Sequence, residues 1–286
     1  MTSARRTIHT ANADIAVADT GGTGTPVLLI HGNSNGKDVF REQLEAPELR
    51  NLRLIAMDLP GHGDSSDAVD PAAYSIAGYA DAAFAVLEGL GVAEAVVMGW
   101  SLGGHIGIEM LSRRLGVRGL MIVGTPPTAT GILGLMRGFH VSLGLLLATR
   151  ARLAPVEMRR FAAICFGDAA DERVMQMIAR TDVRARPALF WSMMKGMSAD
   201  QRSTVEQAPE PIAVVNGDNE PFARLDYLEG IQYGNLWRGR CHVLGGAGHA
   251  PFLQTPAAFN ELLGAFVADV AARPQAAPTT IGQCFA

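Results

Sequence analysis

The sequence predicts an α/β fold built on a mostly parallel, eight-stranded sheet with helices on both faces. Three observations lead to this prediction. Short apolar runs of strand length recur along the chain, turn-forming residues follow each of them, and helical stretches separate them. Such alternation is typical of a parallel sheet that helices cover on both sides. With 286 residues, of which 48% are hydrophobic, the chain is long enough to bury the core that this fold needs.

The expected strands follow one another along the chain. Residues 6–9 and 15–18 flank a polar turn, which predicts an antiparallel hairpin at the edge of the sheet. Six further apolar runs predict the other strands, at residues 27–30, 52–57, 95–98, 120–123, 212–215 and 241–244. Apolar residues at helical spacing predict helices over residues 73–90 and 256–272.

One long segment interrupts the alternation between the sixth and seventh predicted strands. Residues 127–207 are helical in character and rich in leucine and methionine, which predicts a helical lid over the functional site. We therefore expect residues 1–126 and 208–273 to form the core, and residues 274–286 to form a flexible tail. Seven of the twelve methionines lie in the lid, where we expect most to pack in its core and a minority to line an apolar pocket.

Composition argues against several classes of protein. The net charge is −4 and no basic patch stands out, so nucleic acid is not an expected partner. The three cysteines are widely spaced and show neither a disulfide framework nor a zinc pattern. We see no secretory signal and no stretch that could span a bilayer, so we expect a cytoplasmic protein that binds a small molecule without a metal or cofactor.

The sequence GWSLGG at residues 99–104 lies between an apolar run and a helical stretch. A G-x-S-x-G motif in this context is typical of a nucleophile elbow, a strained strand-to-helix turn that projects the serine hydroxyl from the top of the sheet. Ser101 is therefore the candidate nucleophile.

A serine nucleophile needs a base, and the base needs an acid that orients it. In folds with this elbow the chain order is serine, acid, histidine. His249 lies in a loop of small residues after the last predicted strand and is the candidate base. Asp218 and Glu220 both follow the seventh predicted strand, and a Gly-x-x-acid spacing favours Glu220 while leaving Asp218 as the alternative.

The charge that develops during acyl transfer needs two backbone N–H donors. Position in the chain assigns one to Leu102, the residue after the nucleophile, and the other to Asn33, in the loop after the third predicted strand. No histidine-rich metal cluster is present in the sequence, so metal-dependent hydrolysis is not expected.

Together these motifs resemble the α/β-hydrolase superfamily over residues 5–272, and within it the metal-independent N-acyl-homoserine lactonases. The resemblance is carried by residues 31–34, 58–63, 99–110, 211–222 and 247–252. It implies that Ser101, Glu220 and His249 form a catalytic triad that opens acyl-homoserine lactones and so quenches a bacterial signal, with the acyl chain under the lid. That subgroup has a substrate-contacting lid tyrosine, and the matching residue here is Phe161, so the orientation of the substrate stays open.

Other functions fit the same residues. A carboxylesterase or a carbon–carbon bond hydrolase would use the same triad, because the lid sets the choice of substrate. A signal receptor with slow turnover is a further alternative. An epoxide hydrolase is disfavoured, since the nucleophile is serine rather than aspartate and the lid segment contains no tyrosine.

Overall fold

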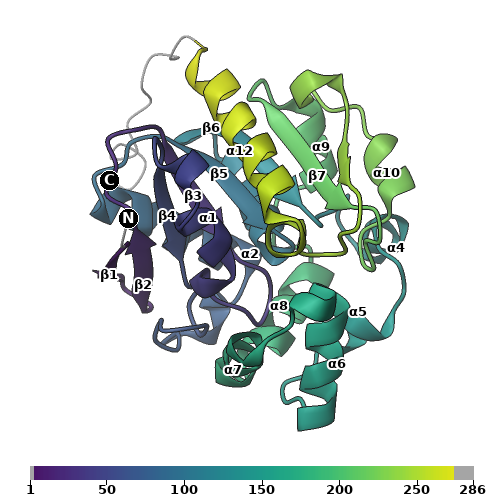
Figure 1. Ribbon diagram of the computed structural model, residues 1–286. Coiled ribbons are helices and arrows are strands. Elements are labelled where there is room, and N and C mark those ends of the chain that lie inside the picture. Colours follow the sequence, from purple (N-terminus) through teal and green to yellow (C-terminus); the bar gives the residue numbers. More distant parts are fainter. Residues whose placement is uncertain (1–2, 274–286) are drawn as a thin grey trace.

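The computed structural model describes residues 3–273, so the predicted tail at residues 274–286 lies outside the described part (Figure 1). Its centre is an eight-stranded sheet in the order β1-β2-β4-β3-β5-β6-β7-β8. The strands are β1 (Ala4–His9), β2 (Asp14–Asp19), β3 (Pro26–Ile30), β4 (Arg53–Met57), β5 (Ala95–Trp100), β6 (Val117–Val123), β7 (Ile212–Gly217) and β8 (His242–Leu244). The predicted edge hairpin is β1–β2, β2 also pairs antiparallel with β4, and every other pair is parallel. The predicted fold class is confirmed.

Alternate residues of the central strands face two separate apolar layers, as the period of a strand requires. Leu28 of β3 and Val97 of β5 pack toward α2 (Ile76–Gly89) and α3 (Leu102–Ser112). Their sequence neighbours face the opposite layer, to which α12 (Pro256–Ala271) contributes Phe259 and Phe266. Figure 1 shows α12, in yellow, and α1 (Arg41–Leu44) in front of the sheet. Both faces are therefore covered by helices.

A helical segment is inserted between β6 and β7, as the sequence predicted. Its helices are α4 (Ile132–Gly138), α5 (Leu143–Leu147), α6 (Pro155–Phe166), α7 (Glu172–Arg180), α8 (Ala185–Met194) and α9 (Gln201–Gln207). Figure 1 shows α5 to α8 gathered beyond one end of the sheet, whereas α9 packs on α3. We call residues 124–211 the inserted segment.

The remaining elements are short. They are α10 (Leu225–Glu229), α11 (Pro251–Gln254) and the 3₁₀ turns Lys37–Phe40, Pro47–Leu49, Pro71–Ala73, Gly167–Ala169 and Trp237–Gly239. The helix predicted from residue 73 begins at Ile76, because the Ser75 hydroxyl accepts a hydrogen bond from the Gly78 N–H and caps it there. Among the described helices, none has the length and apolar character needed to cross a bilayer.

Most methionines of the inserted segment pack on the apolar layers, as the sequence predicted. Met177 is buried, and Met158, Met175 and Met193 are partly buried and pack against these layers. Met136, Met193 and Met194 line an apolar cavity and are the expected minority.

Candidate active site

The candidate nucleophile occupies a turn of a single residue. β5 ends at Trp100, α3 begins at Leu102, and Ser101 between them has φ 54° and ψ −115°. A positive φ is unfavourable for a residue with a Cβ, so this conformation must be held by its surroundings. Glycine allows the close approach: a Cβ at Gly103 would lie 2.0 Å from the carbonyl oxygen of Ile30. The predicted elbow therefore has a direct steric basis.

His249 and Glu220 form a buried pair. The imidazole Nδ1 lies 2.8 Å and 2.9 Å from the two carboxylate oxygens of Glu220, and the residues are 3% and 8% exposed. A carboxylate only accepts, so Nδ1 carries a hydrogen and Nε2 is the nitrogen left to exchange a proton with Ser101. The Glu220 carboxylate also accepts from the N–H groups of Phe222 and Ala223, at 2.8 Å and 3.2 Å.

Two opposing effects set the charge of Glu220. Burial alone would raise the pKa of its carboxyl, but the nearby His249 charge and the hydrogen bonds from His249, Phe222 and Ala223 outweigh burial and leave the pKa below its usual value. The carboxylate is therefore ionised at neutral pH. Its fixed negative charge stabilises a positively charged imidazolium at His249.

Ser101 and His249 both line one small cavity of 50 Å³. Trp100 holds the histidine loop in place, since its indole Nε1 donates to the His249 carbonyl oxygen at 2.7 Å. The ring of Phe222 packs against the imidazole with its centroid 4.5 Å away. Within residues 3–273 no hydrogen bond joins Ser101 directly to His249, and in free hydrolases this contact is often long and tightens when substrate binds.

The alternative acid lies elsewhere. Asp218 is exposed, and its carboxylate accepts hydrogen bonds from the side chain of Asn219 and the N–H of Ala247. Neither contact reaches the imidazole. Of the two acids that the sequence left open, the structure brings Glu220 to His249 and leaves Asp218 on the surface.

The two residues expected to supply backbone donors, Asn33 and Leu102, line the same cavity as Ser101. Gly32 brings the Asn33 loop close, because a Cβ at Gly32 would lie 3.2 Å from the Cβ of Ser101. Leu102 is the first residue of α3, where a helix leaves its N–H groups unpaired and favours negative charge.

A larger apolar cavity of 330 Å³ opens from Ser101. Its walls come mainly from α4, α5 and α8, with apolar side chains at Ile132, Leu135, Met136, Phe139, Val141, Leu145, Leu189, Phe190, Met193 and Met194. Ligand sites commonly have volumes of about 300–1,000 Å³ with walls of this kind. Phe161 of α6 is buried and lines the smaller cavity together with His249.

Several residues at the site carry no signal in the sequence. Trp100 occupies a variable position of the elbow motif, and Arg186 of α8 contacts Ser34 of the Asn33 loop from 152 positions further along the chain. Cys165 lines the small cavity, where burial and then the Glu220 charge raise the pKa of its thiol, so it stays protonated. These contacts depend on the folded arrangement and not on local spacing.

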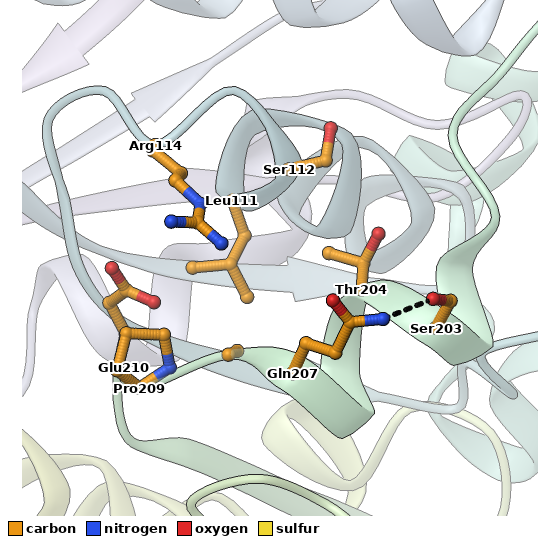
Figure 2. Close-up of a pocket in the computed structure, with 9 residues that line it drawn as sticks. Leu111, Ser112, Arg114, Ser203, Thr204, Gln207, Pro209 and Glu210 are labelled. Atoms are coloured by element: carbon orange, nitrogen blue, oxygen red, sulfur yellow. Dashed lines mark hydrogen bonds between the residues drawn. The ribbon is translucent and has the colours of Figure 1, made fainter.

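A second cleft, of 150 Å³, lies between the end of α3 and α9 (Figure 2). Ser112 and Ser203 line it, but the Ser112 hydroxyl donates to the Glu109 carbonyl oxygen and the Ser203 hydroxyl accepts from Gln207. No histidine is among its lining residues, so neither serine has a base there. Of these two cavities, the Ser101 cavity is the one that has both a serine and a histidine in its lining. Within residues 3–273, no cluster of three or more histidine, cysteine or acidic side chains could hold a metal ion.

Comparisons with known proteins agree with this geometry. The sequence profile described as "Alpha/beta hydrolase family" matches residues 27–262. The structure of the N-acyl homoserine lactonase AidH complexed with N-butanoyl homoserine is 43% identical, with a TM-score of 0.92 over 96% of this chain and 100% of that chain. An AidH variant complexed with N-hexanoyl homoserine lactone gives the same identity and TM-score over 95% of this chain and 100% of that chain. A pimeloyl-[acyl-carrier protein] methyl ester esterase of Xanthomonas axonopodis pv. citri is 31% identical over 265 residues, which cover 87% of this chain and 97% of the esterase.

Proposed function

The chain belongs to the alpha/beta hydrolase family, and we propose that it opens the lactone ring of N-acyl-homoserine lactones. One observation carries the proposal. Ser101 lines both the small cavity that contains His249 and the large apolar cavity, so a carbonyl at the serine has room for an acyl chain beside it. The likeness to AidH over nearly the whole of both chains supports the choice of substrate.

In the first step of the proposed reaction, Nε2 of His249 takes the hydroxyl proton of Ser101 while its oxygen attacks the lactone carbonyl. The N–H groups of Asn33 and Leu102 stabilise the tetrahedral oxyanion. Collapse breaks the bond to the ring oxygen, which receives the proton from His249. The hydroxyl group that forms remains part of the acyl group, so the serine ester contains every atom of the substrate.

In the second step a water molecule loses its proton to Nε2 of His249 and attacks the serine ester. Collapse returns the proton to Ser101 and releases N-acyl-homoserine as a carboxylic acid, which loses its proton to solvent. Glu220 keeps the other imidazole nitrogen protonated throughout and stabilises the imidazolium that forms twice in each cycle.

We further propose that residues 127–207 act as a lid on a core of residues 1–126 and 208–273. The apolar side chains of α4, α5 and α8 then surround the acyl chain, and Phe161 lies beside the lactone ring. A phenylalanine offers an apolar ring surface but no hydroxyl, so Phe161 donates no hydrogen bond to the substrate.

Replacement of the nucleophile tests the proposal. We expect Ser101→Ala to abolish ring opening, followed by chromatography of the product, while binding of the lactone persists in calorimetry. Ser112→Ala is the matched control, because that hydroxyl lies in the other cleft, and it should retain full activity. Turnover by Ser101→Ala would refute the assignment of the nucleophile.

Carboxylester hydrolysis is the second candidate, favoured by the match to the methyl ester esterase. A lactone and the methyl ester of the same acyl-homoserine distinguish the two, since both present the same acyl chain to the apolar cavity. A higher kcat/KM for the lactone supports the first proposal, and a higher value for the methyl ester supports the second.

A further inference from the structure

Arg186 of α8 is a buried cation that makes no ion pair among the described residues. It is 3% exposed, and its guanidinium donates to Ser34 Oγ at 2.7 Å and to the carbonyl oxygens of Ile178 and Ala151 at 3.0 Å and 3.3 Å. Burial lowers its pKa to about 10, so it stays charged at neutral pH. A buried charge is costly unless neighbouring groups satisfy it. A buried charge beside the Ser101 cavity therefore indicates a functional role for Arg186.

Ser34 connects Arg186 to the Asn33 loop. The Ser34 hydroxyl accepts from Arg186 and donates to Asn33 Oδ1 at 3.0 Å. Ser34 has a φ of 64°, in the left-handed region that residues with a Cβ avoid, so its conformation needs support from outside the loop. Arg186 supplies that support from α8.

Asn33 is also held from a second side. Its amide Nδ2 donates to the carbonyl oxygen of Ala148, at the end of α5. Both ends of the Asn33 side chain therefore depend on the inserted segment, directly at Ala148 and through Ser34 at Arg186. Because Arg186 also binds Ala151 and Ile178, one guanidinium links the loop to three parts of that segment.

We propose that Arg186 is a positioning residue that fixes the Asn33 N–H through Ser34, so that the oxyanion hole is complete only while the inserted segment is docked on this loop. The proposal rests on the proposed function in one respect, namely that Asn33 supplies an oxyanion donor. Arg186 also lines the large apolar cavity, but its guanidinium is engaged by Ser34, Ala151 and Ile178, so it joins enclosure of the substrate to catalytic competence through Ser34.

The loss of rate expected on cutting the link between Arg186 and Ser34 has an upper limit. Losing one oxyanion donor costs about 10²–10³ in rate, so displacing a donor should cost less. We expect kcat to fall by about 10- to 100-fold when the link is cut. KM should change by no more than about threefold, because the donor binds the transition state more strongly than the substrate.

Two variants cut the link in different ways. Arg186→Lys keeps the charge, but one ammonium group cannot reproduce the fork of donors that holds three acceptors. Ser34→Ala removes only a hydroxyl and leaves Arg186 in place. Arg184→Lys is the matched control, since Arg184 is two residues away but contacts Asp182 and the Ala68 carbonyl instead of Ser34.

The assay uses hydrolysis of p-nitrophenyl butyrate together with binding of an alkyl boronic acid, which forms a tetrahedral adduct on a serine nucleophile. We expect both link variants to lose kcat and boronate affinity by similar factors, at near-constant KM, while Arg184→Lys behaves as the unmodified protein. Ser34→Ala with unchanged kcat and boronate affinity would overturn the proposal. A loss of kcat that is fully explained by a smaller folded fraction, measured by thermal unfolding, would also overturn it.

These readouts do not depend on the lactone. If the protein hydrolyses the ester but no acyl-homoserine lactone, the proposed substrate is wrong and the role of Arg186 is still decided by the variants. If the protein hydrolyses neither compound, both proposals fall.

Discussion

Replacing Glu220 by glutamine removes the charge beside the imidazole while keeping the shape of the side chain. The side chain of Glu220 is completely buried and is in contact with His249 Nδ1 through both carboxylate oxygens. The amide of glutamine can accept at one atom only. Its NH₂ group either faces the Nδ1 proton or favours the other imidazole tautomer, in which Nε2 carries the proton and cannot take one from Ser101.

The expected magnitude follows from these contacts. In serine hydrolases the change of acid to amide costs about 10⁴ in kcat, and each tenfold loss corresponds to about 1.4 kcal/mol of activation free energy. Glu220 also accepts from the backbone N–H groups of Phe222 and Ala223, and one amide oxygen can retain these bonds. We therefore expect kcat to fall by about 10³–10⁴ with an intact fold.

Steady-state kinetics with N-hexanoyl homoserine lactone measure the effect, and circular dichroism checks the fold. Asp218→Asn is the matched control, because Asp218 is exposed and does not contact His249, and we expect it to stay within about twofold of the unmodified protein. The reasoning is refuted if Glu220→Gln retains more than about a tenth of the activity, or if Asp218→Asn loses as much as Glu220→Gln.

Three further predictions concern stability and specificity. Burial, and then the charge of His31, lower the pKa of His62 to about 3, so below pH 6.5 the unfolded chain binds a proton that the folded protein does not. Stability should therefore decline from about pH 6.5 toward pH 3, with a slope of up to about 1.4 kcal/mol per pH unit from this residue; in urea unfolding, His62→Gln should lower the slope, and an unchanged slope would contradict a buried neutral imidazole at this position. Gly103→Ala should destabilise the fold by about 1–3 kcal/mol or more and reduce activity, because the new Cβ would lie 2.0 Å from the Ile30 carbonyl oxygen; unchanged urea unfolding would contradict the close packing. Met194→Trp should fill part of the 330 Å³ cavity and raise KM for long acyl chains more than for short ones; an equal effect on all chain lengths would place the acyl group elsewhere.

Local sequence signals were sufficient to predict the sheet and the strand-to-helix turn at Ser101. Strands β3 to β8 are apolar runs that end in turn-forming residues, and the glycines around Ser101 encode the close contact of α3 with the end of β3. A local signal also favoured Glu220 over Asp218, because Glu220 follows Gly217 at the Gly-x-x-acid spacing.

Contacts between distant segments could not be predicted. The hydrogen bond from Trp100 to the His249 carbonyl oxygen joins residues 149 positions apart, and the link from Arg186 to Ser34 joins residues 152 positions apart. Neither hydrophobic periodicity nor a sequence motif predicts contacts between such distant residues. The inserted segment was predicted as helical for the same local reasons, but whether its apolar side chains pack or line a cavity is decided by tertiary structure.

Acid quenching during turnover tests the central claim most directly. Mixing the protein with N-hexanoyl homoserine lactone, quenching within the first turnovers and mapping peptides by mass spectrometry should reveal an ester on Ser101. Its added mass should equal that of the whole lactone, because ring opening expels no fragment, whereas p-nitrophenyl hexanoate should add only the hexanoyl group. Ring opening at full rate with no adduct on the Ser101 peptide would contradict nucleophilic catalysis by this serine.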